Sequence, residues 1–238
     1  MKVGESIESI RSAVEKLRQG EFVLIHDADE RENETDFVIA SEFVTAESIR
    51  YMRKEGGGLI FLMISNDIAQ KLQLPFLSDL YADLEDKYPV LKRLIADDIP
   101  YDTKSSFSVY INHRDTFTGI TDKDRSLTIA EFAHLSKQLS GKTDKEILDL
   151  FGSRFRSPGH VPICVASKQP LTSRFGHTEL STALLTMAGL TPVASGCEIM
   201  GDDGKALSKE KARKLAQNHD FAFVEGEEII QSWDEWSK

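Results

Sequence analysis

Cysteine is scarce in this chain of 238 residues, which contains only Cys164 and Cys197. Two cysteines cannot supply the disulfide framework of a small secreted domain or a zinc site of four cysteines, and they agree with a reducing compartment. Long apolar runs are missing too, because the longest, Leu59–Ile64, is far shorter than the ~20 residues of a membrane-spanning helix. The N-terminal residues also lack the pattern of a secretory signal. We therefore expect a cytoplasmic protein with no membrane partner.

Positive charge is the minority charge. The chain has 29 Lys and Arg against 39 Asp and Glu, which gives a formal net charge of −10. Proteins that bind nucleic acids usually carry a basic patch or stripe, whereas the basic residues here are mostly interleaved with acidic ones. Nucleic acid is therefore not an expected partner, although a local basic pocket for a small phosphate is compatible with this composition.

Apolar periodicity divides the chain into alternating helices and strands. Helices are expected at 6–20, 45–55, 65–72, 126–139, from 143 onward, 178–188 and 208–218. Strands are expected at 22–25, 37–40, 59–64, 107–111, 162–166, 193–200 and 221–224. Residues 75–104 are the least regular and are expected to cross the surface, with one helix at 90–96. No repeat or linker interrupts the chain, so we expect a single α/β or α+β domain over residues 1–238.

An acidic segment separates the first two expected strands. Six of the ten residues from 27 to 36 are acidic. Carboxylates this close together are unfavourable unless something compensates their charge, and a hard divalent cation does so. An EF-hand is excluded because no glycine stands at its sharp turn and Arg31 occupies a ligand position. Mg²⁺ fits better, since it needs few protein carboxylates; the alternative is a solvated acidic turn.

A second segment, Thr172–Thr178, leads directly into an expected helix. Gly176 lets a ligand approach the backbone, and the free N–H groups of the helix start can hold an anion together with Arg174 and Thr178. This pattern favours a phosphate site for a small metabolite, but an ordinary turn and N-cap would look the same. His177 is a candidate metal ligand or acid/base residue.

Two further candidates stand beside expected strands. Ser157–Gly159 is expected to form a turn that presents His160 at the mouth of a strand, where working residues are common; the alternative is a merely exposed histidine. Glu198 ends an apolar run, where burial of a carboxylate is costly without a metal, a hydroxyl or an arginine beside it. Cys197 is expected to be a small core residue.

Six motifs follow one another in the order typical of one enzyme family. They are Asp27-x-x-x-Arg31-Glu32-Asn33-Glu34-x-Asp36, Gly57-Gly58-Leu59-Ile60, Thr118-Gly119-Ile120, Arg156-x-Pro158-Gly159-His160-Val161, Thr172-x-Arg174-x-Gly176-His177-Thr178-Glu179 and Cys197-Glu198. Each motif is weak alone. Together they make the chain resemble 3,4-dihydroxy-2-butanone 4-phosphate synthase, the ribulose-phosphate branch of riboflavin biosynthesis, from the first helix to about Val224.

This resemblance implies an α+β fold, an α/β sandwich with a mixed sheet flanked by helices that is shared with the threonylcarbamoyl-adenylate synthases. It implies a lyase that converts D-ribulose 5-phosphate to 3,4-dihydroxy-2-butanone 4-phosphate and formate. The expected cofactor is Mg²⁺, with Mn²⁺ as a substitute and no organic cofactor. Members are homodimers with sites near the subunit interface. The zinc motif of a fused GTP cyclohydrolase II is absent, so a monofunctional, archaeal-like form is expected.

The roles of individual residues follow from the same resemblance. The metal ligands are expected to be Glu32 and His177. The substrate-binding residues are expected to be Arg31, Glu32, Asp36, Thr118, Arg174, Phe175, Gly176, His177, Thr178 and Glu198. The catalytic residues are expected to be His160 and Glu198, supported by Asp27 and Glu34. An anionic ketose needs such a set, because its phosphate and its developing oxyanion must be bound while protons are moved.

Two departures from the family pattern leave other functions open. Phe61 stands where many members carry a cysteine, and Phe175 where a small residue is common, so an inactive metabolite-binding relative is one alternative. A nucleotide-activating or RNA-binding module of the related fold is disfavoured by the acidic charge. A sugar-phosphate isomerase or aldolase would need similar residues, but it would not release formate.

Overall fold

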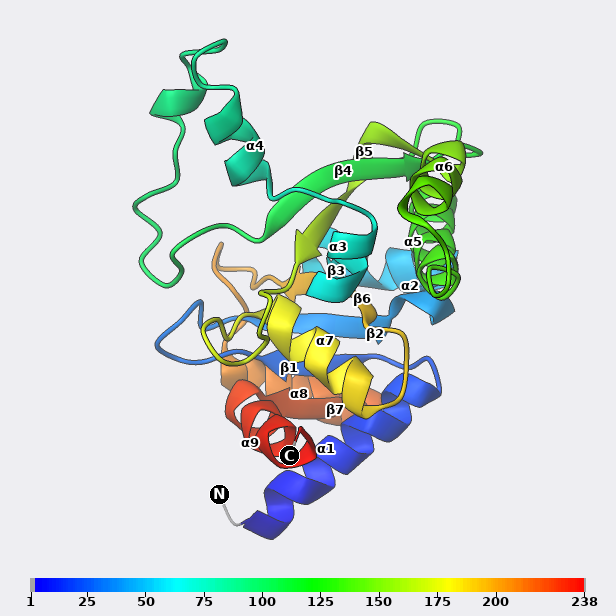
Figure 1. Ribbon diagram of the computed structural model, residues 1–238. Coiled ribbons are helices and arrows are strands. Elements are labelled where there is room, and N and C mark those ends of the chain that lie inside the picture. The colour runs from blue at the N-terminus through cyan, green and yellow to red at the C-terminus, as the bar shows by residue number, and fades with distance from the viewer. Residues whose placement is uncertain (1–2, 238) are drawn as a thin grey trace.

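The computed structural model describes residues 3–237, and it describes side chains from Ile7 onward. Its centre is one seven-stranded sheet with the strand order β4-β5-β3-β6-β2-β1-β7 (Figure 1). The strands are β1 (Val23–His26), β2 (Thr35–Ala40), β3 (Gly57–Ile64), β4 (Phe107–His113), β5 (Phe155–Val165), β6 (Val193–Ile199) and β7 (Ala222–Glu225). The pairs β1–β7 and β3–β5 are parallel and the others are antiparallel, so the expected mixed sheet is confirmed.

Helices cover both faces of this sheet. One face carries α1 (Val3–Arg18), α7 (His177–Met187) and α9 (Gly226–Trp236), which lie in front of the sheet in Figure 1. The other face carries α2 (Ala46–Tyr51), α3 (Asn66–Lys71), α5 (Asp122–Ser136), α6 (Asp144–Arg154) and α8 (Lys209–His219). Within residues 3–237, no helix has both the length and the apolar character needed to cross a membrane.

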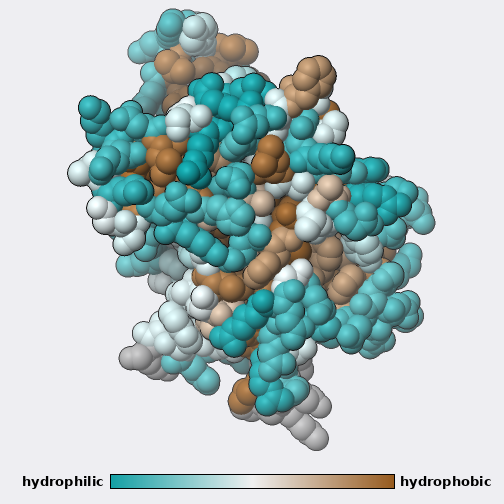
Figure 2. Space-filling view, turned by 90° about the vertical axis from the view of Figure 1, so that its right-hand side faces the viewer, coloured by the Kyte–Doolittle hydropathy of each residue, from teal (hydrophilic) through white to brown (hydrophobic). Residues whose placement is uncertain are grey.

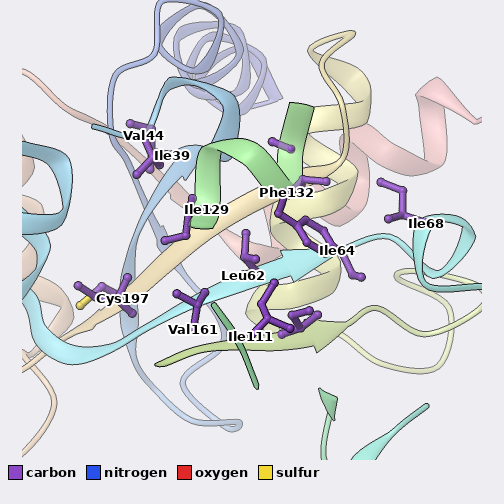
Figure 3. Packing of buried hydrophobic residues seen from close by; sticks show 14 of the residues in the cluster. Ile39, Val44, Leu62, Ile64, Ile68, Ile111, Ile129, Phe132, Val161 and Cys197 are labelled. Atoms are coloured by element: carbon purple, nitrogen blue, oxygen red, sulfur yellow. The ribbon is translucent and has the colours of Figure 1, made fainter. Parts of the chain in front are cut away.

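Alternate side chains of each strand enter the two cores, because neighbouring residues of a strand point to opposite faces. Phe37 belongs to the core on the α5 side, and Val38 to the core on the α7 side. The α5-side core includes Leu62, Ile64, Ile111, Ile129, Phe132 and Val161 (Figure 3). By the same alternation Asp36 faces α7, and Glu198, its direct partner on β6, faces α7 with it. The pleat therefore brings two carboxylates together under one helix.

Strand β2 begins earlier than its sequence pattern predicts. The expected strand started at residue 37, whereas β2 starts at Thr35 and pairs with β6 as far as Asp36 and Glu198. Acidic residues are unfavourable in strands, so the pattern placed Asp36 in the loop. In the structure the ladder to β6 holds Asp36 in the sheet.

The expected turn before His160 is wrong. Residues 157–160 belong to β5, and the register jumps from Ile111 opposite Val161 to Asn112 opposite Arg156, so that these residues bulge out of the ladder. A Cβ on Gly159 would lie 1.9 Å from the carbonyl carbon of Ile111. Glycine at 159 is therefore what allows the bulge to lie against β4.

Residues 75–104 leave the sheet as an extended arm, seen at the upper left of Figure 1. The helix expected at 90–96 is wrong, because only one 3-10 turn forms, at Leu91–Arg93. A helix that the sequence did not predict, α4 (Leu77–Asp83), precedes it. This helix has no side-chain cap and buries no residue, so its sequence carries little helical periodicity.

Candidate active site

The acidic loop between β1 and β2 is folded around the buried carboxylate of Asp27. Its two oxygens accept hydrogen bonds from the backbone N–H groups of Glu32 and Glu34, each at 3.0 Å. The guanidinium of Arg31 lies 3.1 Å from the same carboxylate. These bonds hold the loop over the start of α7, so that Arg31 and Glu32 point toward that helix.

His177, the first residue of α7, meets the acidic loop there. Its Nδ1 lies 3.4 Å from Oε2 of Glu32, and its Nε2 lies 3.7 Å from Oδ1 of Asp36, beyond hydrogen-bonding distance. Asp27, Glu32 and His177 each place one ligand-type atom within 4.8 Å of the others. Among the described residues, Nε2 of His177 and both oxygens of Asp36 are buried without a hydrogen-bond partner. Because unpaired buried polar atoms are costly, this cluster is suited to receive additional groups.

Glu198 lies beside Asp36 on the floor of the site. Its Oε2 accepts a hydrogen bond of 2.8 Å from the backbone N–H of Leu59. A Cβ on Gly58 would lie 2.4 Å from the same oxygen, so glycine is needed for this close approach of β3. The Gly-Gly motif at the start of β3 thus positions Glu198.

The carboxylates of the site differ in their affinity for protons. Burial raises the pKa of Asp36 to about 8, and it also raises the pKa of Glu198 and of Glu34. Burial opposes the charged form of Glu32 as well, but the hydrogen bond from His177 and the charge of Arg31 lower its pKa to about 2. One ionised carboxylate therefore lies among others that hold protons more readily, a separation typical of acid/base sites.

The pKa of His177 shifts upward, because its charged neighbours are carboxylates. Burial by itself lowers the pKa of the imidazole, but Asp36, Glu32 and Asp27 outweigh it and raise the pKa to about 9. The histidine thus carries a proton at neutral pH when no cation is bound. Binding of a metal through this ring must release that proton.

Two arginines form the other side of the site. Arg174 pairs with the fully buried carboxylate of Glu179, which also accepts the N–H of Ser167 at 2.7 Å. A Cβ on Gly176 would lie 2.8 Å from a guanidinium nitrogen of both Arg174 and Arg31. Glycine at the start of α7 therefore lets both positive groups approach the free N–H groups of the helix, which is an arrangement suited to an anion.

A cavity of about 100 Å³ lies between the carboxylates and the arginines. It is lined by Arg31, Glu32, Asp36, Phe61, Ser106, Phe107, Cys164, Arg174, His177, Thr178 and Glu198. Phe61 closes one wall as an apolar side chain. Burial raises the pKa of the Cys164 thiol to about 12, which favours the protonated thiol over the nucleophilic thiolate. Cys197 lies in the α5-side core, as expected.

His160 and Thr118, by contrast, lie outside the cavity. Exposed His160 bonds to Asn112 of β4, with Nδ1 at 3.1 Å from the side-chain amide nitrogen and its backbone N–H at 2.9 Å from the amide oxygen. Thr118 is exposed and bonds to Asp124. A Cβ on Gly119 would lie 2.1 Å from Asn112, so this loop packs against the same amide. We call Asn112, Phe117, Thr118, Gly119 and His160 the His160 patch; within residues 3–237, no hydrogen bond or ion pair joins it to the cavity.

Phe175 also points elsewhere. Its side chain is 41% exposed and lines a surface pocket beside Asp29 and Lys209 rather than the cavity. It therefore does not narrow the cavity.

The sequence did not identify two residues that complete the arginine side. Glu179 was part of a motif, but its role as the partner of Arg174 needed the helix to be placed. Asp102, which contacts both arginines, lies in the irregular stretch 75–104 and is preceded by no periodic signal. The role of Asp102 becomes visible only in the structure, where the arm returns to the arginines.

Comparisons with known proteins agree with this geometry. A sequence model of the 3,4-dihydroxy-2-butanone 4-phosphate synthase family matches residues 11–232. Proteins of that name from Methanothermobacter thermautotrophicus and Methanosarcina mazei are 47% and 42% identical to the chain, over 98% of its length and over 99% and 94% of theirs. A crystal structure of 3,4-dihydroxy-2-butanone 4-phosphate synthase in complex with two magnesium ions matches with a TM-score of 0.73 at 25% identity, over 95% of this chain and 96% of that one. The chain therefore belongs to the 3,4-dihydroxy-2-butanone 4-phosphate synthase family.

Proposed function

We propose that this chain, acting as a single domain, converts D-ribulose 5-phosphate to 3,4-dihydroxy-2-butanone 4-phosphate and formate in riboflavin biosynthesis. The observation that carries the proposal is the convergence of three kinds of group on one cavity. These are the Glu32–His177 pair, the proton-holding carboxylates Asp36 and Glu198, and a pair of arginines. A phosphorylated ketose presents one anionic end and several exchangeable protons, which match these groups.

The proposed metal ligands are Glu32 and His177, with Asp27 within reach. A divalent cation fits them, because their ligand atoms lie close together and buried polar atoms around them lack partners. Mg²⁺ is the proposed ion, with Mn²⁺ as a substitute and no organic cofactor, since hard cations prefer carboxylate oxygens. When bound, the cation supplies Lewis-acid stabilisation of negative charge on a substrate oxygen.

The proposed proton transfers rest on the residues of the chain. Glu198 is assigned to the early transfers, because its raised pKa brings it closer to neutral pH and its hydrogen bond to Leu59 fixes its direction. Asp36, which shares a face with Glu198, donates a hydrogen bond to a substrate oxygen when it is protonated. Asp27 supports the site by holding the acidic loop, and Glu34 adds a further carboxylate beside it.

We further propose a homodimer in which the His160 patch of one copy completes the cavity of the other. His160 is assigned as an acid/base residue, yet its own cavity does not contact it. Beside it, Phe117 is 95% exposed and Ile120 is 51% exposed. Apolar side chains this exposed favour burial against another surface, and a second copy supplies one while delivering His160 and Thr118.

Formate release from D-ribulose 5-phosphate tests the proposed function. We expect formate with Mg²⁺ and its loss after addition of EDTA, and we expect no formate from D-ribulose, which lacks the phosphate. Folded, Mg²⁺-loaded protein that releases no formate would contradict the proposal. Conversion to an isomer or to cleavage products without formate would indicate an isomerase or an aldolase instead.

A further inference from the structure

Asp102 occupies the space between the two arginines. One of its oxygens, Oδ2, lies 2.7 Å from Nη2 of Arg31, 3.0 Å from Nε of Arg174 and 2.8 Å from Nη2 of Arg174. Its side chain is only 9% exposed. A carboxylate oxygen that accepts two charge-assisted hydrogen bonds and makes a third close ion-pair contact takes the position that an oxygen of a phosphoryl group would take.

The two arginines do not need Asp102 to hold them in place. Arg174 is paired at its other edge with Glu179. Arg31 is paired with Asp27 at 3.1 Å and with Glu32 at 2.8 Å. Each guanidinium is thus anchored by residues of the acidic loop or of α7, whereas Asp102 comes from the arm outside the sheet. Removal of its carboxylate should leave the arginines where they are.

Asp102 and a bound phosphate cannot occupy the site together. Two arginines already face three carboxylates besides Asp102, so a dianion added beside it would meet strong repulsion. Space gives the same answer. The cavity of about 100 Å³ is smaller than the ~300–1,000 Å³ of typical ligand sites. A second cavity of about 570 Å³ adjoins Arg174, and its lining includes Tyr101 and Asp102. Ser106 and Arg174 line both cavities, and Asp102 lines the larger one.

We propose that Asp102 is an internal competitor for the phosphate group of the substrate, which binds by displacing this carboxylate from Arg31 and Arg174. The inference rests on the proposed function, in which these arginines bind the phosphate. The apparent affinity for a phosphate ester is then the intrinsic affinity reduced by the fraction of molecules in which Asp102 has left. A phosphate dianion competes with the singly charged carboxylate of Asp102 for the arginines better than a ligand with a carboxylic acid group does. Asp102 therefore also selects for phosphorylated ligands.

Titration of the full chain with inorganic phosphate in Mg²⁺ tests this role by calorimetry. Asp102→Asn is compared with wild type and with Asp98→Asn, a matched control that removes one exposed charge from the same arm. If Asp102 closes the site in two thirds to nine tenths of molecules, its removal tightens phosphate binding roughly three- to tenfold, and Asp98→Asn changes it little. KM for D-ribulose 5-phosphate should fall by the same factor. Asp102→Ala offers no amide oxygen to the arginines, so its gain in phosphate affinity should be larger than that of Asp102→Asn.

Phosphate binding in both Asp102 variants that is equal to or weaker than in Asp98→Asn would overturn the proposal, because Asp102 would then merely support the arginines. This outcome is distinct from failure of the proposed function. Wild-type protein that releases no formate but binds phosphate more tightly after Asp102→Asn would contradict the reaction alone. Normal formate release without tighter phosphate binding would contradict the role of Asp102 alone.

Discussion

The cavity under α7 and the His160 patch carry the same kinds of residue in opposite settings. In the cavity, Asp36 is 1% exposed and the His177 side chain 6% exposed, and every arginine is anchored by a carboxylate. In the patch, His160 lies on the surface, and among the described side chains its hydrogen-bond partner is the neutral amide of Asn112. Figure 2 shows one face of the molecule, where brown apolar groups are scattered among teal polar ones.

This difference separates the part of the proposed site that a single chain encloses from the part that it leaves exposed. Burial separates the proton affinities of the cavity carboxylates and leaves polar atoms that await a ligand. The patch has the residue types for catalysis but lacks an enclosed space in which to act. In the proposed homodimer the cavity is the preorganised half of the site, and the patch is the half that a second copy would deliver. The following predictions test that division, beginning with the largest effect.

Glu32→Gln should lower metal-dependent formate release at least about a thousandfold, because loss of a cation ligand removes several kcal/mol of stabilisation of the developing charge. Calorimetry with Mg²⁺ should show weaker binding. Glu30→Gln is the matched control, since Glu30 lies exposed in the same acidic loop. Full activity in the Glu32 variant, with unchanged Mg²⁺ binding, would place the metal elsewhere.

Glu198→Gln should lower turnover roughly 10²- to 10⁴-fold, the range typical of loss of a general acid or base. Gln preserves the acceptor for the N–H of Leu59, so folding and phosphate binding should be retained. Single-turnover measurements with D-ribulose 5-phosphate would follow the change. Near-normal turnover in this variant would show that another group carries the early proton transfers.

Inactive Glu32→Ala subunits mixed with inactive His160→Ala subunits should regain activity. In a shared arrangement each mixed dimer contains one cavity with an intact Glu32 that receives an intact His160. Formate release from purified heterodimers, marked by two different affinity tags, measures the recovery. Homodimers of each variant provide the baseline, and heterodimers that stay at that baseline would mean that each copy uses its own His160.

Two glycine substitutions should change stability in opposite directions. Gly159→Ala should cost roughly 1–3 kcal/mol of unfolding free energy, because its Cβ would meet the backbone of β4. Gly152→Ala lies in α6 with open space around its Cβ and should add about 0.5–1 kcal/mol. Urea unfolding monitored by circular dichroism compares both with wild type. A Gly159 variant as stable as wild type would show that the bulge tolerates a side chain.

The sequence predicted the elements that have strong periodicity or clear caps. The strand that became β3, the helix that became α7 and the capping box of α6 were recognised because apolar spacing and N-cap chemistry act over a few residues. The helix at 90–96 and the turn before His160 were wrong. At 157–160, pairing with β4 outweighed the local preference for a turn. At 90–96, no buried contact supports a helix, and only a 3-10 turn forms.

The sequence by itself determined the chemistry available to this protein: an excess of carboxylates, a loop with Arg31 and Glu32, and a glycine before His177. Only the tertiary structure decided which of these groups meet. Glu32 and His177 lie far apart in the chain and come within 3.4 Å because β1, β2 and α7 pack together. The same packing left His160 outside the cavity and placed Asp102 between the arginines. Residue types are local properties, whereas contacts between distant segments depend on how sheet and helices bury their apolar faces.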